Sequence, residues 1–172
     1  RRAVILANVF RKALLERYNG TGKVFYIGHW EGDWHLVDDY NRNQNPLPPL
    51  KVSGMIDWLN VRQQAIEDAK ADVADTDVQL YHYTEVNLVV KSLDQGLPSL
   101  TTKVLPNTNV DYVSYSAYDA IGSTSYSQIY SNLNRTINFI ENYLPEKQGL
   151  PPGRRVFIGE YGYPFGRPGG AS

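Results

Sequence analysis

The chain has 172 residues, hydrophobic and charged contents of 42% and 20%, and a formal net charge of -1. This balance supplies no basic surface for nucleic acid and no attraction to an anionic membrane, so neither partner is expected. The absence of cysteine excludes disulfides, thiolate nucleophiles and cysteine metal sites, and it leaves the compartment undetermined.

The first third of the chain predicts a helix, a strand and a long loop. Apolar residues recur at helical spacing over 2–18, and an Asn-Gly pair supplies the stop. Residues 23–29 are rich in β-branched and aromatic side chains, which indicates a strand, and they open into the polar, aromatic segment 30–34. Residues 38–53 carry three asparagines and three prolines, a composition typical of a loop.

The rest of the chain alternates strands with helices. In chain order we expect a helix over 55–69, a strand over 78–85, a weaker helix over 86–95, a turn-rich segment over 96–109, a strand and its tip over 111–119, a helix over 129–144 and a strand over 155–160. A first helix followed by repeated β-loop-α units predicts an α/β domain with a parallel sheet.

Four parallel strands make up about half of a (β/α)₈ TIM barrel, which runs to about 250 residues. The competing architecture is a doubly wound open sheet, but no G-x-G-x-x-G phosphate loop follows any predicted strand. We therefore expect residues 1–172 to form one incomplete TIM-barrel domain of four parallel strands with intervening helices. Its partners would be the missing barrel strands, or a second copy bound through the exposed sheet edges.

The last predicted strand ends on a carboxylate, Glu160, which glycines flank within 158–162. Further carboxylates follow the earlier strands among many aromatic rings, and the chain contains 13 tyrosines. Glycoside hydrolysis needs two carboxyl groups, one to protonate the leaving oxygen and one to attack or stabilise the anomeric carbon. Aromatic faces offer apolar area to a sugar ring. The strand tips therefore predict a carbohydrate substrate.

The segment Ile158-Gly159-Glu160-Tyr161-Gly162 resembles the clan of retaining glycoside hydrolases with (β/α)₈ barrels. In that clan the nucleophile is a Glu ending the seventh strand, often in an Ile-Gly-Glu-Phe/Tyr-Gly context. The resemblance implies that Glu160 is the nucleophile, that the chain supplies strands four to seven, and that Glu31 on strand four is the acid/base. It also implies that Tyr115, on strand six, hydrogen-bonds Glu160.

The segment around Glu31 departs from the clan, in which an Asn usually stands immediately before the acid/base. Here Trp30 holds that position. The sequence Trp30-Glu31-Gly32-Asp33-Trp34 also resembles a segment of uncharacterised glycosidase-like barrel proteins. If the mechanism is the retaining one, the Glu31 and Glu160 carboxyl groups should lie ~5–5.5 Å apart.

The remaining tip residues are expected to contact the substrate. Trp30, Trp34 and Tyr163 would form sugar platforms, and the wider set comprises His29, Asp33, His82, Glu85, Asn87 and Tyr118. No metal-ligand spacing joins the histidines to the carboxylates, so neither a metal nor a cofactor is expected.

Several alternatives stay open. Glu85 could replace Glu31 as the acid/base, or the chain could belong to a non-catalytic carbohydrate-binding barrel. Glu31 and Asp33 could both be solvated loop acids. Core packing is equally open for Tyr115 and Tyr118, whose odd separation places them on opposite faces of a strand.

Overall fold

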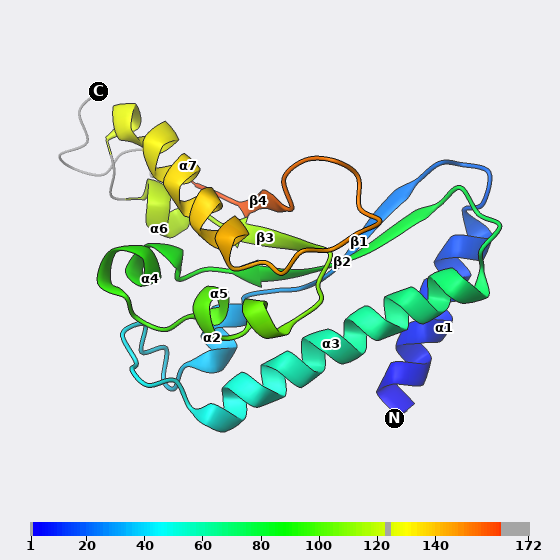
Figure 1. The fold of residues 1–172 in the computed structure, drawn as a ribbon, viewed down its shortest axis with the longest axis horizontal. Helices are drawn as coiled ribbons and strands as arrows, with labels where there is room; N and C mark the ends of the chain where they lie inside the picture. Colours follow the sequence, from blue (N-terminus) through cyan, green and yellow to red (C-terminus); the bar gives the residue numbers. More distant parts are fainter. Residues whose placement is uncertain (1, 123–124, 163–172) are drawn as a thin grey trace.

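The computed structural model describes residues 2–122 and 125–162, which form an α/β fold around a four-stranded sheet. The strands pair in the order β1-β2-β3-β4, and all three pairings are parallel. Figure 1 shows the sheet with its connecting helices. The strands are β1 (Val24–His29), β2 (Gln79–Val86), β3 (Tyr112–Ser116) and β4 (Val156–Glu160). The predicted α/β class and parallel sheet are confirmed.

Helices join successive strands. They are α1 (Arg2–Arg17), α2 (Gly32–Leu36), α3 (Pro49–Asp72), α4 (Val89–Gln95), α5 (Leu100–Lys103), α6 (Tyr118–Ile121) and α7 (Tyr126–Asn142), with a 3-10 turn η1 (Leu105–Asn107). The predicted loop 38–53 overlaps the start of α3, because Pro49 lies in the first helical turn, where the missing N–H of a proline costs no hydrogen bond. The helices α2, α5 and α6 were not predicted, since four or five residues are too few to show a helical period.

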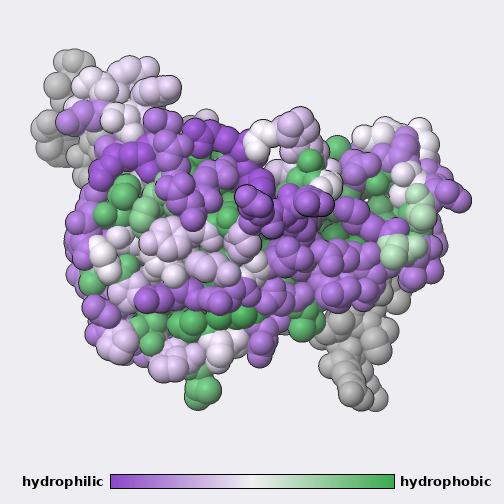
Figure 2. Space-filling view, in the orientation of Figure 1, coloured by the Kyte–Doolittle hydropathy of each residue, from purple (hydrophilic) through white to green (hydrophobic). Residues whose placement is uncertain are grey.

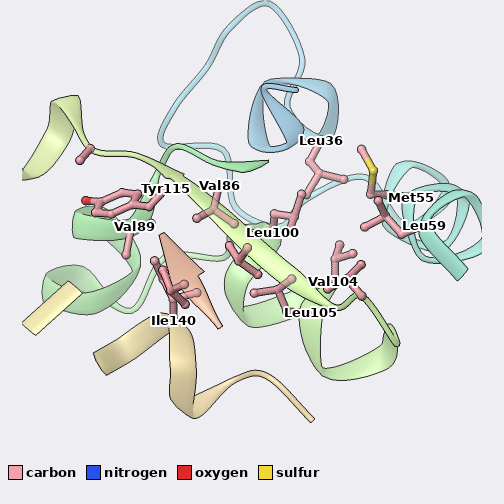
Figure 3. Close-up of a cluster of buried hydrophobic side chains, with 14 of the residues drawn as sticks. Leu36, Met55, Leu59, Val86, Val89, Leu100, Val104, Leu105, Tyr115 and Ile140 are labelled. Atoms are coloured by element: carbon pink, nitrogen blue, oxygen red, sulfur yellow. The ribbon is translucent and has the colours of Figure 1, made fainter. Parts of the chain in front are cut away.

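One face of the sheet packs against the helices. Right-handed crossovers between strands in the order 1-2-3-4 place every connecting helix on the same face. Two apolar clusters lie there, and both draw alternate residues from the strands: Leu80 in one, and Val86, Val113, Tyr115 and Val156 in the other. Figure 3 shows Val86 and Tyr115 among side chains from four helical segments, labelled Leu59, Val89, Leu100 and Ile140.

The surface of the helical layer faces solvent. The view in Figure 2, which matches Figure 1, is mainly hydrophilic over α3 and α7, with smaller hydrophobic areas between. On α7 the predicted stripe is confirmed: Ile140 is fully buried, and Ile129, Leu133 and Ile137 pack against the same cluster. Helix α7 is therefore amphipathic and buries one side against the sheet.

The other face of the sheet is a layer of aromatic rings. Tyr26 lies 5.5 Å from Tyr81, 5.3 Å from Tyr112 and 5.9 Å from Phe157 between ring centroids, and Tyr83 lies 5.5 Å from Phe157. The side chains of Tyr26 and Phe157 are still 46% and 36% exposed. The strands β1 and β4 are the edges of the sheet, so the described residues form an open sheet and do not close a barrel.

Candidate functional site

A cavity of about 1010 Å³ opens at the carboxyl ends of the strands. Its walls come from the segments that follow β1, β2 and β3 and from the tip of β4. The lining includes two carboxylates of the predicted catalytic set, Glu31 and Glu160, and two of the predicted sugar platforms and contacts, Trp34 and Tyr118. Further polar residues that line it are Arg42, Asn43, Asn87, Lys91, Gln95, Ser116 and Asp119.

Glu160 reaches this cavity from an irregular strand end. The register between β3 and β4 shifts there, so that Tyr115 pairs with Ile158 while Ser116 pairs with Glu160. The intervening Gly159 runs close against β3, because a Cβ atom at that position would lie 1.9 Å from the Ser114 hydroxyl oxygen. A glycine is therefore required for this strand to bring Glu160 to the sheet edge.

The carboxylate of Glu160 accepts two hydrogen bonds. The indole Nε1–H of Trp30 donates to Oε1 at 2.8 Å, and the Ser116 hydroxyl donates to Oε2 at 3.4 Å. Trp30 itself is 61% exposed, so its ring remains open to a ligand while its nitrogen holds Glu160. Trp30 and Glu160 are 130 positions apart in sequence and are brought together by the sheet.

Glu31 has a left-handed backbone, with φ 52° and ψ 44°, immediately before α2. This conformation is uncommon for a residue with a side chain and needs support from its neighbours. The support comes from Glu85, whose Oε1 accepts the Glu31 backbone N–H at 3.1 Å. Gly32 follows in a tight space, since a Cβ there would lie 2.6 Å from the Glu85 carbonyl oxygen. These contacts place Glu31 on the cavity wall.

Glu85 lies beneath this surface, with 3% of the residue exposed. Besides the Glu31 N–H, its carboxylate accepts hydrogen bonds from the Asn87 amide at 3.3 Å and the Ser114 hydroxyl at 3.4 Å. Burial raises the pKa of Glu85, the Glu31 N–H opposes that shift, and the charge of Glu160 adds to it. Glu85 was predicted to contact the substrate, and the structure places it beneath the cavity rather than among the described residues that line it.

Asp33 is also buried, at 1% exposure. Its carboxylate accepts three backbone N–H groups, those of Asn87 at 2.8 Å, Leu88 at 3.2 Å and Leu100 at 2.6 Å. Burial raises the pKa of Asp33, and the three N–H donors counter that rise. Asp33, which was predicted to contact the substrate, joins α2 to the end of β2 and the start of α5, and it is not among the described residues that line the cavity.

The histidines predicted at the substrate face the helices instead. His82 is fully buried, where Arg62 Nε donates to its Nε2 at 3.3 Å and its Nδ1 lies 3.3 Å from the Gln63 side-chain oxygen. Burial, followed by the charge of Arg62, lowers the pKa of His82 to about 3. At His29, Nδ1 accepts the Trp58 indole N–H at 3.3 Å, and burial lowers the pKa to about 4. Neither histidine is among the residues found on the cavity wall.

Tyr115 belongs to the hydrophobic core, and its hydroxyl donates to Asp119 Oδ1 at 2.5 Å. Burial and the nearby Asp119 raise the pKa of Tyr115. The predicted hydrogen bond from Tyr115 to Glu160 is therefore replaced by one to Asp119, because Tyr115 is one residue out of phase with the inner face that carries Ser114 and Ser116. Asp119 also accepts the Val90 N–H at 2.8 Å and lines the cavity.

The structure thus brings Trp30, Glu31, Trp34, Asn87, Tyr118 and Glu160 to one region and leaves His29, Asp33, His82, Glu85 and Tyr115 behind it. The predicted platform Tyr163 lies outside the described residues. Sequence reasoning missed Arg42, Lys91 and Ser116. Only Ser116 carried a signal, since it alternates with Tyr112 and Ser114 along β3.

Within the described parts of the chain, no group of three His, Asp or Glu side chains is arranged to hold a metal ion. No helix among those residues is long and apolar enough to cross a membrane. A comparison of the chain with protein-family models, with curated proteins and with solved structures finds no match.

Proposed function

We propose that the chain is part of a retaining glycoside hydrolase built on a (β/α)₈ barrel. The observation that carries the proposal is the shared cavity: Glu31 and Glu160 line it together at the carboxyl ends of parallel strands, where barrel enzymes hold their catalytic groups. Exposed aromatic residues, Trp30 and Tyr118, lie at the same place and suit the apolar face of a sugar ring.

The sheet supports the barrel part of the proposal. Its strands follow sequence order without a reversal, whereas a doubly wound sheet reverses and covers both faces with helices. All-parallel sheets are normally covered on both faces, yet the aromatic face around Tyr26 and Phe157 stays partly open. In a closed barrel these rings would fill the interior, and β1 and β4 would pair with further strands.

In the proposed reaction, a Glu160 oxygen attacks the anomeric carbon while the Glu31 carboxyl gives its proton to the departing glycosidic oxygen. The glycosidic C–O bond breaks and a glycosyl ester on Glu160 forms. Glu31 then takes a proton from water, whose oxygen attacks the anomeric carbon and releases Glu160. Trp30 fixes the carboxylate through Oε1, where its N–H is 2.8 Å away, and thereby orients the other oxygen.

The anomeric configuration of the product, and whether bound saccharides are turned over, test this reaction. The first product formed from an aryl glycoside by the full-length protein should keep the anomeric configuration of the substrate, as followed by proton NMR. An inverted product would contradict the two-step mechanism. Binding of saccharides without any turnover would instead favour the non-catalytic carbohydrate-binding barrel.

A second assignment of the acid/base keeps Glu160 and uses Glu85. The raised pKa of Glu85 and its electrostatic interaction with Glu160 favour it, because a general acid must hold a proton near neutral pH. Against it stands the burial of Glu85. With an activated aryl glycoside, azide should restore turnover to the acid/base variant, so rescue of Glu31→Gln but not of Glu85→Gln supports Glu31, and the reverse supports Glu85.

A further inference from the structure

Two cations lie together on the wall of the cavity and have no carboxylate bound to them. Lys91, on α4, is 6% exposed, and its ammonium donates a hydrogen bond to the backbone oxygen of Arg42. The guanidinium of Arg42 forms no hydrogen bond or ion pair with any residue that the structure describes. Both side chains line the cavity that contains Glu31 and Glu160.

Several other cations of the described chain find acceptors, although Arg11, 2% exposed, leaves Nε and Nη1 without a hydrogen bond. Lys51 lies 2.7 Å from Asp38, Lys147 lies 2.7 Å from Asp111, and the Arg155 guanidinium donates to backbone oxygens, such as that of Val110 at 2.6 Å. Lys91 differs because an ammonium has three N–H donors and this one has a single acceptor. A buried ammonium with unpaired N–H donors is costly, so a further acceptor from outside the described residues would stabilise it.

The nearest acid does not fill that role. Burial lowers the pKa of Lys91, and the negative charge of Asp33 opposes that shift, so the two groups interact electrostatically. Its oxygens, however, already accept the N–H groups of Asn87, Leu88 and Leu100. Arg42 further lowers the pKa of Lys91, which places two like charges close together on one side of the cavity.

We infer that Arg42 and Lys91 form a subsite for an anionic group on the saccharide, with a uronic acid carboxylate as the preferred ligand. The inference rests on the proposed function and names its substrate class. The planar guanidinium of Arg42 matches a carboxylate through two parallel N–H bonds, and the Lys91 ammonium adds a point charge. A sulfate ester carries the same charge with a different shape. Gln95 and Asn43, on the same wall, offer amides to neighbouring hydroxyl groups.

The test is a titration of the full-length protein with D-glucuronate, D-glucose and D-glucose 6-sulfate, repeated with galacturonate and galactose. We expect one uronate to bind about tenfold more tightly than its neutral sugar, a difference of about 1.4 kcal/mol. Arg42→Gln, an exposed change, should reduce that ratio about threefold. The pair Arg42→Gln and Lys91→Met should bring the ratio of uronate to neutral-sugar affinity close to 1. Equal or tighter binding of the sulfate would make charge, rather than carboxylate shape, the recognised feature and would overturn the uronate assignment.

The matched control is Arg154→Gln, which removes one exposed positive charge from outside the cavity wall and should leave the ratio unchanged. Equal affinities for uronate and neutral sugar would overturn the subsite while leaving the proposed function in place. An unchanged ratio of uronate to neutral-sugar affinity in Arg42→Gln would also overturn the subsite. That variant keeps the buried Lys91, so its folding is not at risk from the loss of this side chain. If neither sugar of either pair binds, the saccharide function itself fails and the subsite with it.

Discussion

Four carboxylates at the strand ends divide into two pairs that differ in their surroundings. Glu31 and Glu160 line the cavity, while Asp33 and Glu85 are 1% and 3% exposed. The buried pair accepts backbone N–H groups, three at Asp33 and one at Glu85. Carboxylates therefore support the loops beneath the site in one pair and line the cavity in the other. Burial and hydrogen bonding, rather than position at a strand end, separate the two roles.

The largest effect should follow from Glu160→Gln, which keeps the size of the side chain and removes the attacking charge. Turnover should fall by several orders of magnitude, with little change in the midpoint of thermal unfolding. Steady-state kinetics of the full-length protein on an aryl glycoside would measure it. Glu146→Gln is the matched control, because Glu146 is exposed and away from the cavity wall. Activity close to that of the wild type in Glu160→Gln would remove Glu160 from the mechanism.

In contrast to Glu160→Gln, Asp33→Ala should act first on the stability of the fold. Three backbone N–H groups would lose a charged acceptor in a buried place, so the free energy of unfolding should fall by about 3–5 kcal/mol. Chemical denaturation would measure the change. The control Asp68→Ala alters an exposed acid whose partner is Gln64 on the same helix, and it should cost less than about 0.5 kcal/mol. Equal losses in the two variants would contradict the structural role of Asp33.

Trp30→Phe should test whether the indole N–H of Trp30 orients Glu160. The substitution keeps an aromatic face but removes the N–H that donates to Glu160 Oε1. Because the carboxylate then loses one of its two orienting donors, kcat should fall about tenfold with a smaller change in KM. Trp58→Phe also removes an indole N–H, but that donor binds His29 outside the cavity, so kcat should stay unchanged. A pure KM effect in Trp30→Phe would make Trp30 a platform alone.

The pH dependence of stability should report the buried histidine behind the site. His82 has a pKa near 3 in the folded protein and an ordinary value near 6.5 when unfolded, so unfolding takes up a proton between these values. The contribution of His82 is fully present above pH 6.5 and is lost as the pH falls, by about 1.4 kcal/mol per pH unit. Chemical denaturation of the wild type and of His82→Gln at pH 7, 6 and 5 should show a difference in the free energy of unfolding that narrows as the pH falls, most steeply below pH 6. A difference independent of pH would mean that folding does not lower the pKa of His82.

The strands and the cavity carboxylates were predictable because their signals are local. Apolar runs ending on Glu31 and Glu160 mark strand ends, and parallel strands align such ends at one edge of a sheet. The face on which a side chain lies was harder to predict, because a shift of one residue moves it from the aromatic face of the sheet to the face covered by helices. Tyr115 and His82 are on the helix side for that reason.

Other parts of the site had no signal in the sequence. Arg42 follows β1 within a long loop, and Lys91 lies inside a short helix, so neither is at a strand end. Their meeting depends on the path of residues 38–48, which no periodicity describes. Asp33, two residues after Glu31, looked like a second surface acid, and only the start of α2 and its packing against α5 turn it inward.

The most direct test of the central claim is to identify which carboxylate becomes covalently attached to the sugar. The full-length protein would be incubated with a panel of 2-deoxy-2-fluoro glycosyl fluorides, whose glycosyl esters are slow to hydrolyse, and the labelled peptide would be sequenced by mass spectrometry. We expect a label on Glu160, no label in the Glu160→Gln protein, and no label on Asp33 or Glu85. A label on either buried acid would contradict the division between the cavity pair and the buried pair, and a label on Glu31 would contradict the assignment of Glu160 as the nucleophile.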